Sequence, residues 1–337
     1  MSSKAVEIFD AIEKAERIVI TSHRSPDGDS MGSSAGLFHV LKKMGKNPVV
    51  CHPDHCPKFL DWVMDGCDWY VHELEPEKVT QLMAEADLIF CMDYNGPDRM
   101  GHGMADLLRQ SEAFKIMLDH HPRPDDFVDI AESRITEGST CQILYDVIDE
   151  GGKLDYLEIK AGEAIYLGIM TDTGSFRFSS VNPRTHEILS KLLAIGVNHT
   201  SVHERTFDNV CLDRLKLQGY AIANKLEIIQ HFHIAYIWLT EEELNKFHYK
   251  KGDTDGLVNV ALAIEGIKVA AFFSEKDGQI KISFRSKGTI PVNGIASEFD
   301  GGGHVNAAGG VSQKSMEDTI HRFKTLIPKY FKGLNEV

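Results

Sequence analysis

Four short segments of the sequence carry histidines and aspartates of the kind that bind divalent metal ions. They are HRSPDGD, CMDYN, LDHH and TDTGSFRF. Their candidate metal ligands are His23, Asp27, Asp29, Asp93, Asp119, His120, His121 and Asp172. Carboxylate and imidazole ligands without thiolates favour Mn²⁺ or Mg²⁺ over structural zinc, and the imidazoles favour manganese, with Co²⁺ as a further alternative.

Four of these aspartates, Asp27, Asp29, Asp93 and Asp172, would repel one another strongly if they met without cations. Two divalent ions would neutralise them. A carboxylate shared by two ions holds the ions roughly 3.5–4 Å apart, which is the separation used for in-line displacement at phosphorus. We therefore expect a site with two metal ions that activates water for the hydrolysis of phosphate esters.

The elements that must position these residues read as alternating strands and helices. The apolar runs RIVITSH, DLIFCMD and FKIMLDHH predict strands, and helical patterns lie between them, as in EPEKVTQLMAEA. This alternation is typical of an α/β fold with a parallel sheet covered by helices on both faces. Taken singly, a carboxylate after a strand is equally well explained as a helix cap. The site is favoured because functional groups of such sheets gather beyond the carboxyl ends of the strands.

The length of 337 residues suits two domains. We expect a metal-binding catalytic domain over residues 1–195, a helical linker over 196–228 and a smaller α/β substrate-binding domain over 229–337. In the last of these, HFHIAYIWLT, IKVAAFFSE and QIKISFRS predict strands. Helices are expected there near 255–264, 292–299 and 315–330.

A glycine run in the second domain, GGGH, could bind phosphate. The backbone of consecutive glycines can approach an anion closely and present successive N–H groups to it. Neighbouring side chains could add charge-assisted hydrogen bonds. The candidate phosphate-binding residues are Gly301, Gly302, Gly303, His304, Arg285 and Ser286. A glycine-rich turn with a structural histidine is the alternative.

Three further polar residues stand near the candidate ligands with two interpretations each. Arg99, six residues after Asp93, could reach the site or decorate a helix start. Ser139 and Thr140 read as caps at the beginning of a helix. We include Arg99 among the candidate substrate-binding residues and leave the other two outside the site.

Charge and hydropathy limit the partners. The formal net charge is −14, so the chain as a whole repels a polyanion, and long duplex DNA is not an expected partner. Neither an apolar signal core nor a run of about 18 apolar residues is present, so we expect a cytoplasmic protein that does not associate with membranes.

Six cysteines are scattered without CxxC pairing, which predicts free thiols in a reducing compartment. The segment CHPDHC could be imagined as a zinc site built from Cys51, His52, His55 and Cys56. Tight zinc sites usually draw their ligands from two separated clusters, and two prolines indicate an irregular connection here, so a connection is the preferred interpretation.

The four metal-ligand motifs resemble the four ordered motifs of the DHH phosphoesterase family. The segment RSKGTIPVNGIASEFDGGGHVNAAGG resembles the signature of its DHH-associated substrate-binding subdomain. Together these segments extend the resemblance over nearly the whole chain. The branch that the sequence most resembles comprises bacterial bifunctional oligoribonucleases and 3′-phosphoadenosine 5′-phosphate phosphatases, often called nanoRNases.

The resemblance implies a role for each residue of the site, and it places the segment with Ser139 and Thr140 near that site. One metal would be held by His23, Asp27 and Asp93. The other would be held by Asp29, Asp93, His120 and Asp172, with Asp93 as the bridge. The catalytic set would be Asp93, Asp119 and His121, in which Asp119 supports its neighbours and His121 faces the phosphate rather than a metal.

The resemblance also implies the substrates: short single-stranded RNA or DNA oligonucleotides and phosphorylated nucleotides. A linear or cyclic dinucleotide phosphodiesterase and an exopolyphosphatase-like enzyme are the alternatives within phosphate chemistry. A non-catalytic nucleotide- or RNA-binding module is disfavoured, because every proposed ligand position holds a competent residue. A homodimer is left open.

Overall fold

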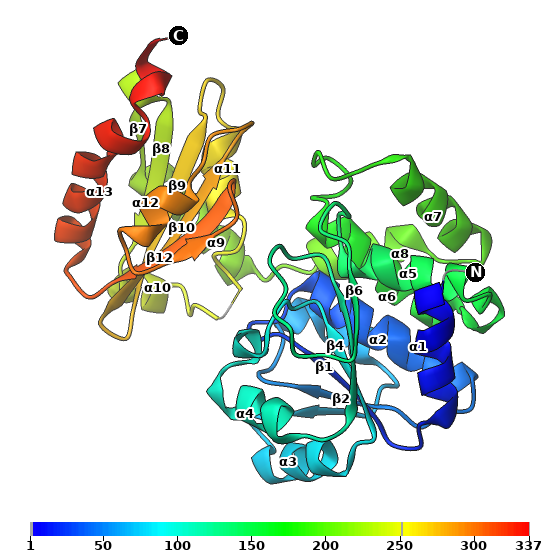
Figure 1. The fold of residues 1–337 in the computed structure, drawn as a ribbon. Helices are drawn as coiled ribbons and strands as arrows, with labels where there is room; N and C mark the ends of the chain where they lie inside the picture. The colour runs from blue at the N-terminus through cyan, green and yellow to red at the C-terminus, as the bar shows by residue number, and fades with distance from the viewer. Residues whose placement is uncertain (1–2, 251, 337) are drawn as a thin grey trace. The chain divides into compact units, whose positions relative to one another are not determined.

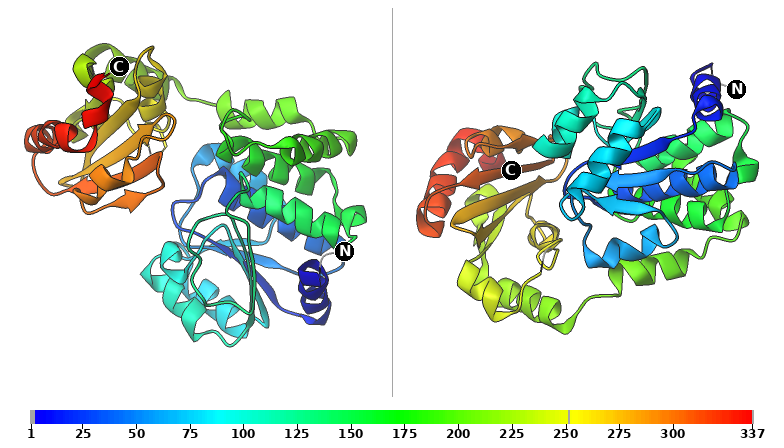
Figure 2. Two further views of the ribbon diagram at one scale, coloured as in Figure 1. Left: turned by 45° about the horizontal axis from the view of Figure 1, so that its top comes forward. Right: turned by 90° about the horizontal axis from the view of Figure 1, so that it is seen from below.

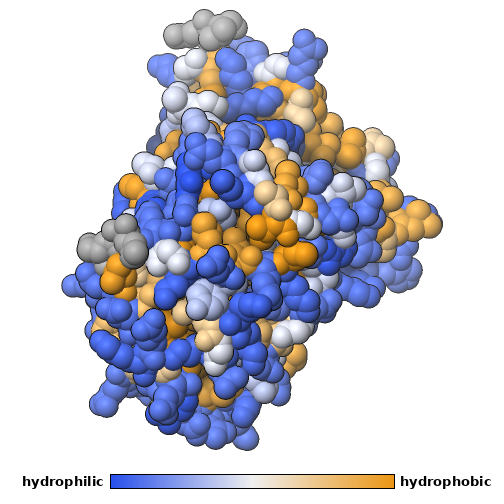
Figure 3. All heavy atoms as spheres, turned by 90° about the vertical axis from the view of Figure 1, so that its right-hand side faces the viewer, coloured by the Kyte–Doolittle hydropathy of each residue, from blue (hydrophilic) through white to orange (hydrophobic). Residues whose placement is uncertain are grey.

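The computed structural model describes residues 3–250 and 252–336. The chain divides into two compact units, Met1–Asn209 and Val210–Val337, each built around a six-stranded sheet (Figure 1). In the part of the chain that is described, no helix is both long and apolar enough to cross a bilayer. Hydrophilic groups cover most of the face drawn in Figure 3, with hydrophobic groups in patches between them.

The sheet of the first unit is entirely parallel, with the strand order β3-β2-β1-β4-β5-β6. Its strands are β1 (Ile18–Ser22), β2 (Val49–His52), β3 (Trp69–Val71), β4 (Leu88–Met92), β5 (Phe114–Asp119) and β6 (Ile130–Ser133). From β1, the strands β2 and β3 follow towards one edge of the sheet. From β4, the strands β5 and β6 follow towards the opposite edge, so the strand order reverses between β1 and β4. Parallel sheets bind ligands beyond the carboxyl ends of the strands at such a reversal of strand order.

Helices cover both faces of this sheet (Figure 2). Ile20 and Phe90 point into a core shared with α1, α2, α5, α6 and α7, whereas Ile89 and Cys91 point into a core shared with α3 and α4. Successive strand residues therefore serve opposite cores. The helices are α1 (Ser3–Lys14), α2 (Gly28–Lys43), α3 (Pro76–Glu85), α4 (His102–Gln110), α5 (Thr140–Glu150), α6 (Ile159–Asp172), α7 (Pro183–Ala194) and α8 (His199–Phe207).

Helices α2 and α6 pack closely because both carry glycine at their contact. A Cβ atom on Gly32 would lie 2.4 Å from the carbonyl oxygen of Ala164, and one on Gly168 would lie 2.6 Å from Oδ1 of Asp29. Larger side chains would force the helices apart. This close contact brings Asp29, in the first turn of α2, near Asp172, the last residue of α6.

The second unit has a mixed sheet with the order β11-β12-β10-β9-β8-β7, in which only the β8–β9 pair is parallel among the described strands. The strands are β7 (Leu226–Ile229), β8 (Ile234–Leu239), β9 (Val269–Lys276), β10 (Gln279–Ser286), β11 (Gly302–Gly303) and β12 (Ala307–Ser312). The helices are α9 (Leu212–Lys225), α10 (Glu241–Lys246), α11 (Leu257–Ala263), α12 (Asn293–Ser297) and α13 (Met316–Tyr330). Phe323 of α13 packs on one face, and Leu217 of α9 packs on the other.

The predicted fold class is confirmed: a parallel sheet with helices on both faces, followed by a smaller α/β unit. One local prediction was wrong. Residues 226–228 were expected within a helical linker, yet Leu226–Ile229 form β7, which pairs antiparallel with β8. The segment LEII ends in two β-branched isoleucines and pairs with the edge of the sheet, so tertiary pairing outweighs the helical pattern of the preceding residues.

Candidate metal-binding active site

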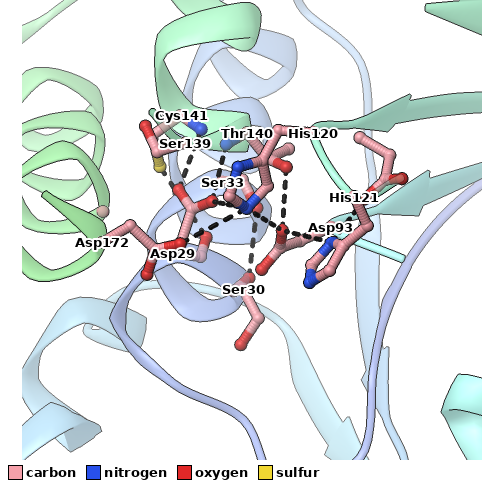
Figure 4. Close-up of polar contacts among 12 residues, drawn as sticks. Asp29, Ser30, Ser33, Asp93, His120, His121, Ser139, Thr140, Cys141 and Asp172 are labelled. Atoms are coloured by element: carbon pink, nitrogen blue, oxygen red, sulfur yellow. Dashed lines mark hydrogen bonds and ion pairs between the residues drawn. The ribbon is translucent and has the colours of Figure 1, made fainter. Parts of the chain in front are cut away.

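The candidate ligands meet at the carboxyl ends of the central strands. His23 follows β1, Asp93 follows β4 and His120 follows β5, so the parallel sheet delivers all three to the same edge. Asp29 comes from the first turn of α2, and Asp172 ends α6. Figure 4 shows His120 between Asp29, Asp93 and Asp172.

One group of ligands forms around His23. Its Nε2 lies 3.3 Å from Oδ2 of Asp93 and 3.8 Å from Oδ2 of Asp27. The other ring nitrogen, Nδ1, lies 2.8 Å from the carbonyl oxygen of Arg24. Because a carbonyl can only accept, Nδ1 carries a proton and Nε2 faces the carboxylates, as a metal-binding imidazole requires.

Asp27 caps a helix with one carboxylate oxygen and faces His23 with the other. Its Oδ1 accepts hydrogen bonds from the backbone N–H groups of Asp29 and Ser30, each at 3.1 Å, and thereby caps α2. Its Oδ2 faces His23. A helix cap and a metal ligand are therefore compatible in one carboxylate, since each oxygen serves a separate purpose.

The second group forms around His120. Its Nε2 lies 3.3 Å from Oδ2 of Asp172, 3.5 Å from Oδ1 of Asp93 and 3.8 Å from Oδ2 of Asp29. Asp93 thus faces one group with each of its two oxygens. That arrangement is what a carboxylate bridging two cations requires.

The backbone holds Asp93 in an uncommon conformation. Its φ is +65°, in the left-handed region, and its N–H donates to the carbonyl of Leu118 at 2.9 Å. The hydroxyl of Thr140 donates to Oδ1 of Asp93 at 2.9 Å. A strained residue at a strand end that is fixed by two hydrogen bonds is a common feature of functional sites.

The N-terminus of α5 holds Asp29. The carboxylate of Asp29 accepts hydrogen bonds from the backbone N–H groups of Thr140 at 2.6 Å and Cys141 at 2.9 Å. The positive end of the helix dipole favours a negative charge at this position. From the sequence, Ser139 and Thr140 were expected as caps, and the family resemblance placed their segment near the site. Ser139 does cap α5, by accepting the N–H of Gln142, whereas Thr140 contacts two candidate ligands.

Protons take up part of the negative charge in this cluster. Burial disfavours the charged imidazole of His120, but its hydrogen bond to Asp172 and the charge of Asp93 outweigh burial and raise the pKa of His120 to about 11. In His23, burial is likewise outweighed by Asp93 and Asp27, and the pKa rises to about 9. Burial and the neighbouring carboxylates hold the pKa of Asp29 well above its ordinary range. Without metal ions the cluster therefore gathers protons to balance its carboxylates.

Asp119, His121 and Arg99 form a chain beside the cluster. Nδ1 of His121 donates to Oδ1 of Asp119 at 2.8 Å, and Nε2 of His121 lies 3.3 Å from Nη2 of Arg99. Arg99 belongs to the short helix η2 (Pro97–Met100), so the structure brings it to the site. Nδ1 of His121 is also 3.6 Å from Asp93, and Asp93, His120 and His121 form a further group that could hold a metal ion.

In the second unit, the glycine run lies exposed at the turn into β11. Close packing explains two of its glycines. A Cβ atom on Gly301 would lie 1.9 Å from the carbonyl oxygen of Gly309, and Gly303 has a φ of +142°. At Gly302 nothing lies within 4 Å of such a Cβ atom. Packing among the described residues therefore does not require a glycine at position 302.

The two polar residues predicted beside the glycine run already have partners within their own unit. The hydroxyl of Ser286 donates to the carbonyl of Ile290 and accepts from the side chain of Asn306, which braces the loop after β10. Arg285 donates from Nη1 to the carbonyl of Phe284 at 3.0 Å, and burial lowers its pKa. Arg285 keeps further N–H groups for a ligand, whereas the single proton of Ser286 is already used.

The segment CHPDHC does not act as one cluster. Cys51 and His52 are buried in β2. His55 and Cys56 instead approach Asp61, with Sγ of Cys56 3.3 Å from Oδ1 of Asp61. These three side chains could together act as metal ligands. The spacing of CHPDHC does not indicate this group, because Asp61 lies outside that segment.

Comparison with known proteins gives two family matches and several relatives. Residues 17–169 match the DHH family N-terminal domain, and residues 230–333 match the DHHA1 domain. The bifunctional oligoribonuclease and PAP phosphatase NrnA of Bacillus subtilis is 28% identical over 90% of this chain and 91% of its own length. The cyclic-di-AMP phosphodiesterase GdpP of Geobacillus thermodenitrificans is 25% identical over 96% of this chain, which corresponds to 49% of that protein.

Among solved structures, an exopolyphosphatase-related protein from Bacteroides fragilis is 37% identical to this chain. It superimposes with a TM-score of 0.95 and covers 99% of this chain and 98% of its own. The similarity therefore extends over both units.

Proposed function

This chain belongs to the DHH family, with a DHH N-terminal domain and a DHHA1 domain, and we propose that it hydrolyses phosphate ester bonds in short oligoribonucleotides and in 3′-phosphoadenosine 5′-phosphate. The observation that carries this proposal is the position of Asp93, which presents one oxygen to each of two ligand groups. The B. subtilis relative, a bifunctional oligoribonuclease and PAP phosphatase, supports the choice of substrates.

The donor set fits two divalent cations, for which Mn²⁺ is our first choice. His23, Asp27 and Asp93 would hold one, and Asp29, Asp93, His120 and Asp172 the other. The raised pKa values of His23 and His120 support this assignment, because the protons occupy places where cations would balance the same carboxylates. When bound, such ions supply positive charge that acidifies an attacking water and stabilises the phosphoryl oxygens.

The protein's own residues orient the substrate and handle the proton. Asp119 fixes the Nδ1–H of His121, so Nε2 is the ring atom that can exchange a proton with the leaving oxygen. Arg99, in contact with that nitrogen, can donate to a non-bridging phosphate oxygen. We assign His121 as the proton-transfer residue and Arg99 as a phosphate-binding residue.

Substrate recognition in the second unit is assigned to Gly302, His304 and Arg285. The glycine run is exposed, and Arg285 stands on β10, which is separated from β11 by the strand β12. Among the described residues, the guanidinium of Arg285 donates only to the carbonyl of Phe284. A few donors suffice for one or two phosphates, so a chain with a net charge of −14 can act on short nucleic acids.

A cyclic dinucleotide phosphodiesterase is the second candidate. It is favoured by the similarity to GdpP, which spans 96% of this chain. Both candidates break a phosphate ester at the same cluster and differ only in what surrounds the scissile phosphate.

One experiment tests both candidates. Purified protein with Mn²⁺ is incubated with end-labelled di- to pentanucleotides, 3′-phosphoadenosine 5′-phosphate, cyclic di-AMP and polyphosphate. Mononucleotides and AMP should accumulate fastest, and an Asp93→Asn variant should form neither. Preferential cleavage of cyclic di-AMP would favour the second candidate. If no substrate is cleaved with any of Mn²⁺, Mg²⁺ or Co²⁺, the proposed function is wrong.

A further inference from the structure

A cavity with a volume of about 580 Å³ opens beside the metal-ligand cluster, entirely within the first unit. Its wall includes His23 and Asp27 of the cluster and two arginines, Arg24 and Arg99. The volume lies within the range of small-molecule sites, about 300–1,000 Å³. It therefore has room for more than the single phosphate that the cluster itself would bind.

The two arginines are fixed relative to each other by the backbone. The N–H of Arg24 donates to the carbonyl of Arg99 at 2.9 Å, which ties the loop after β1 to the short helix η2. The Cδ atom of Arg24 lies 3.7 Å from the position that a Cβ atom on Gly101 would occupy. Loop and helix thus each contribute one arginine to the lining of the cavity.

Their positive charge is not balanced by a salt bridge. Within the described residues, the side chain of Arg99 is hydrogen-bonded to His121, and neither arginine forms an ion pair with a carboxylate. Asp98, on the same wall, is paired with Arg109 instead. Besides Asp27 of the cluster, Asp125 is the remaining carboxylate of the lining, and it is exposed. Guanidinium groups left without carboxylate partners beside a phosphate-hydrolysing cluster are suited to bind an oxyanion.

We propose that Arg24, together with Arg99, forms a subsite for a second phosphate of the substrate, adjacent to the phosphate that is hydrolysed. This inference rests on the proposed function and makes it more specific. It assigns to Arg24 a role in selecting substrates that carry at least two phosphates, as in an oligonucleotide or a nucleoside bisphosphate.

Kinetics with substrates of one and two phosphorus centres test the subsite. The variants are Arg24→Gln, the conservative Arg24→Lys, and Arg17→Gln as a control that removes one exposed positive charge elsewhere in the same unit. For 3′-phosphoadenosine 5′-phosphate and a trinucleotide, Arg24→Gln should lower kcat/KM about tenfold, mainly through KM, which is the expected loss of one charge-assisted hydrogen bond. For bis(p-nitrophenyl) phosphate the change should stay below about twofold. Arg24→Lys should recover part of the loss.

Equal losses on both kinds of substrate, or no loss on either, would overturn the subsite. A binding measurement separates this failure from a failure of the proposed function. In calorimetry on chelator-treated protein, 3′-phosphoadenosine 5′-phosphate should bind more tightly than AMP, and Arg24→Gln should remove most of that difference. If the difference persists in the variant, Arg24 does not bind the second phosphate, whatever the enzyme hydrolyses. Inorganic phosphate as a competitor distinguishes a general anion site, which it would fill, from a nucleotide subsite.

Discussion

The two units arrange their candidate functional groups in opposite ways. In the first unit, Asp29 and Asp93 are almost completely buried and are held by hydrogen bonds from other elements. In the second unit, the candidate groups are an exposed glycine run at a short edge strand. The first arrangement fixes the direction of charged side chains, and the second offers backbone N–H groups to solvent.

This difference follows from the task proposed for each unit. Buried carboxylates repel one another, so they persist only when protons or cations balance them, and they bind cations strongly for the same reason. An exposed glycine run costs little to maintain and can release its ligand quickly. Substitutions in the first unit should therefore abolish catalysis, whereas those in the second should weaken substrate binding.

The largest effect is expected for Asp93→Asn. The amide cannot bridge two cations, and losing several kcal/mol of charge stabilisation corresponds to a decrease in kcat of about 10³-fold or more. Metal content, measured by mass spectrometry after gel filtration, should fall together with activity. Asp106→Asn, an exposed carboxylate on α4, is the control and should retain both. Full activity in the Asp93 variant would refute the bridging role.

The pH dependence of stability should differ between the metal-free and the metal-loaded protein. In the metal-free state the pKa of His23 is raised from 6.5 to about 9. A raised folded-state pKa stabilises the fold below pH 6.5, and this contribution is lost as the pH rises through about 9. The pKa of Asp172, raised by burial to about 6, acts in the same direction at lower pH.

Bound cations would replace these protons, so metal affinity should increase by up to about tenfold per pH unit for each proton displaced. Melting temperatures in chelator should decrease between pH 6.5 and 9, whereas those in excess Mn²⁺ should not. Parallel melting curves in the two conditions would show that protons and cations do not compete for the cluster.

A smaller effect is expected for Thr140→Val, which keeps the shape of the side chain and removes the hydroxyl that donates to Asp93. Groups that orient metal ligands typically contribute about 10- to 100-fold to activity or metal affinity. Thr140→Ser keeps the hydroxyl and should stay near the wild type. The readout is the Mn²⁺ concentration for half-maximal activity, and an unchanged value would mean that the backbone alone positions Asp93.

The ends of the strands were predictable from the sequence because the signals are local. Apolar runs stop abruptly at His23, Asp93 and Asp119, and a parallel sheet brings such ends to one edge whatever the details of packing. The meeting of His23, Asp93 and His120 therefore required only the fold class, whereas Asp29 and Asp172 come near them through the close packing of α2 and α6. Recognition of the motifs then added roles that spacing alone left open.

The supporting contacts were not predictable in the same way. Thr140 lies 111 residues from Asp29, and nothing in EGSTCQ indicates that the start of α5 meets that carboxylate. The strand β12, AAGGVS, lacks the bulky β-branched pattern of a strand and exists because β10 and β11 pair with it. Such features depend on tertiary contacts, which a single sequence does not specify.

The smallest effect is expected in the second unit, for Gly302→Ala. A methyl group fits there without a clash, so the melting temperature should not change. If a substrate phosphate approaches this backbone, the methyl group should cost about 1 kcal/mol of binding, which raises KM about fivefold and leaves kcat unchanged. Gly301→Ala is the matched contrast, because its Cβ atom would lie 1.9 Å from a carbonyl oxygen and should destabilise the unit. If Gly302→Ala leaves KM unchanged while Gly301→Ala unfolds the unit, the glycine run serves only the packing of the edge strand, and phosphate recognition must rest on Arg285 and on the cavity of the first unit.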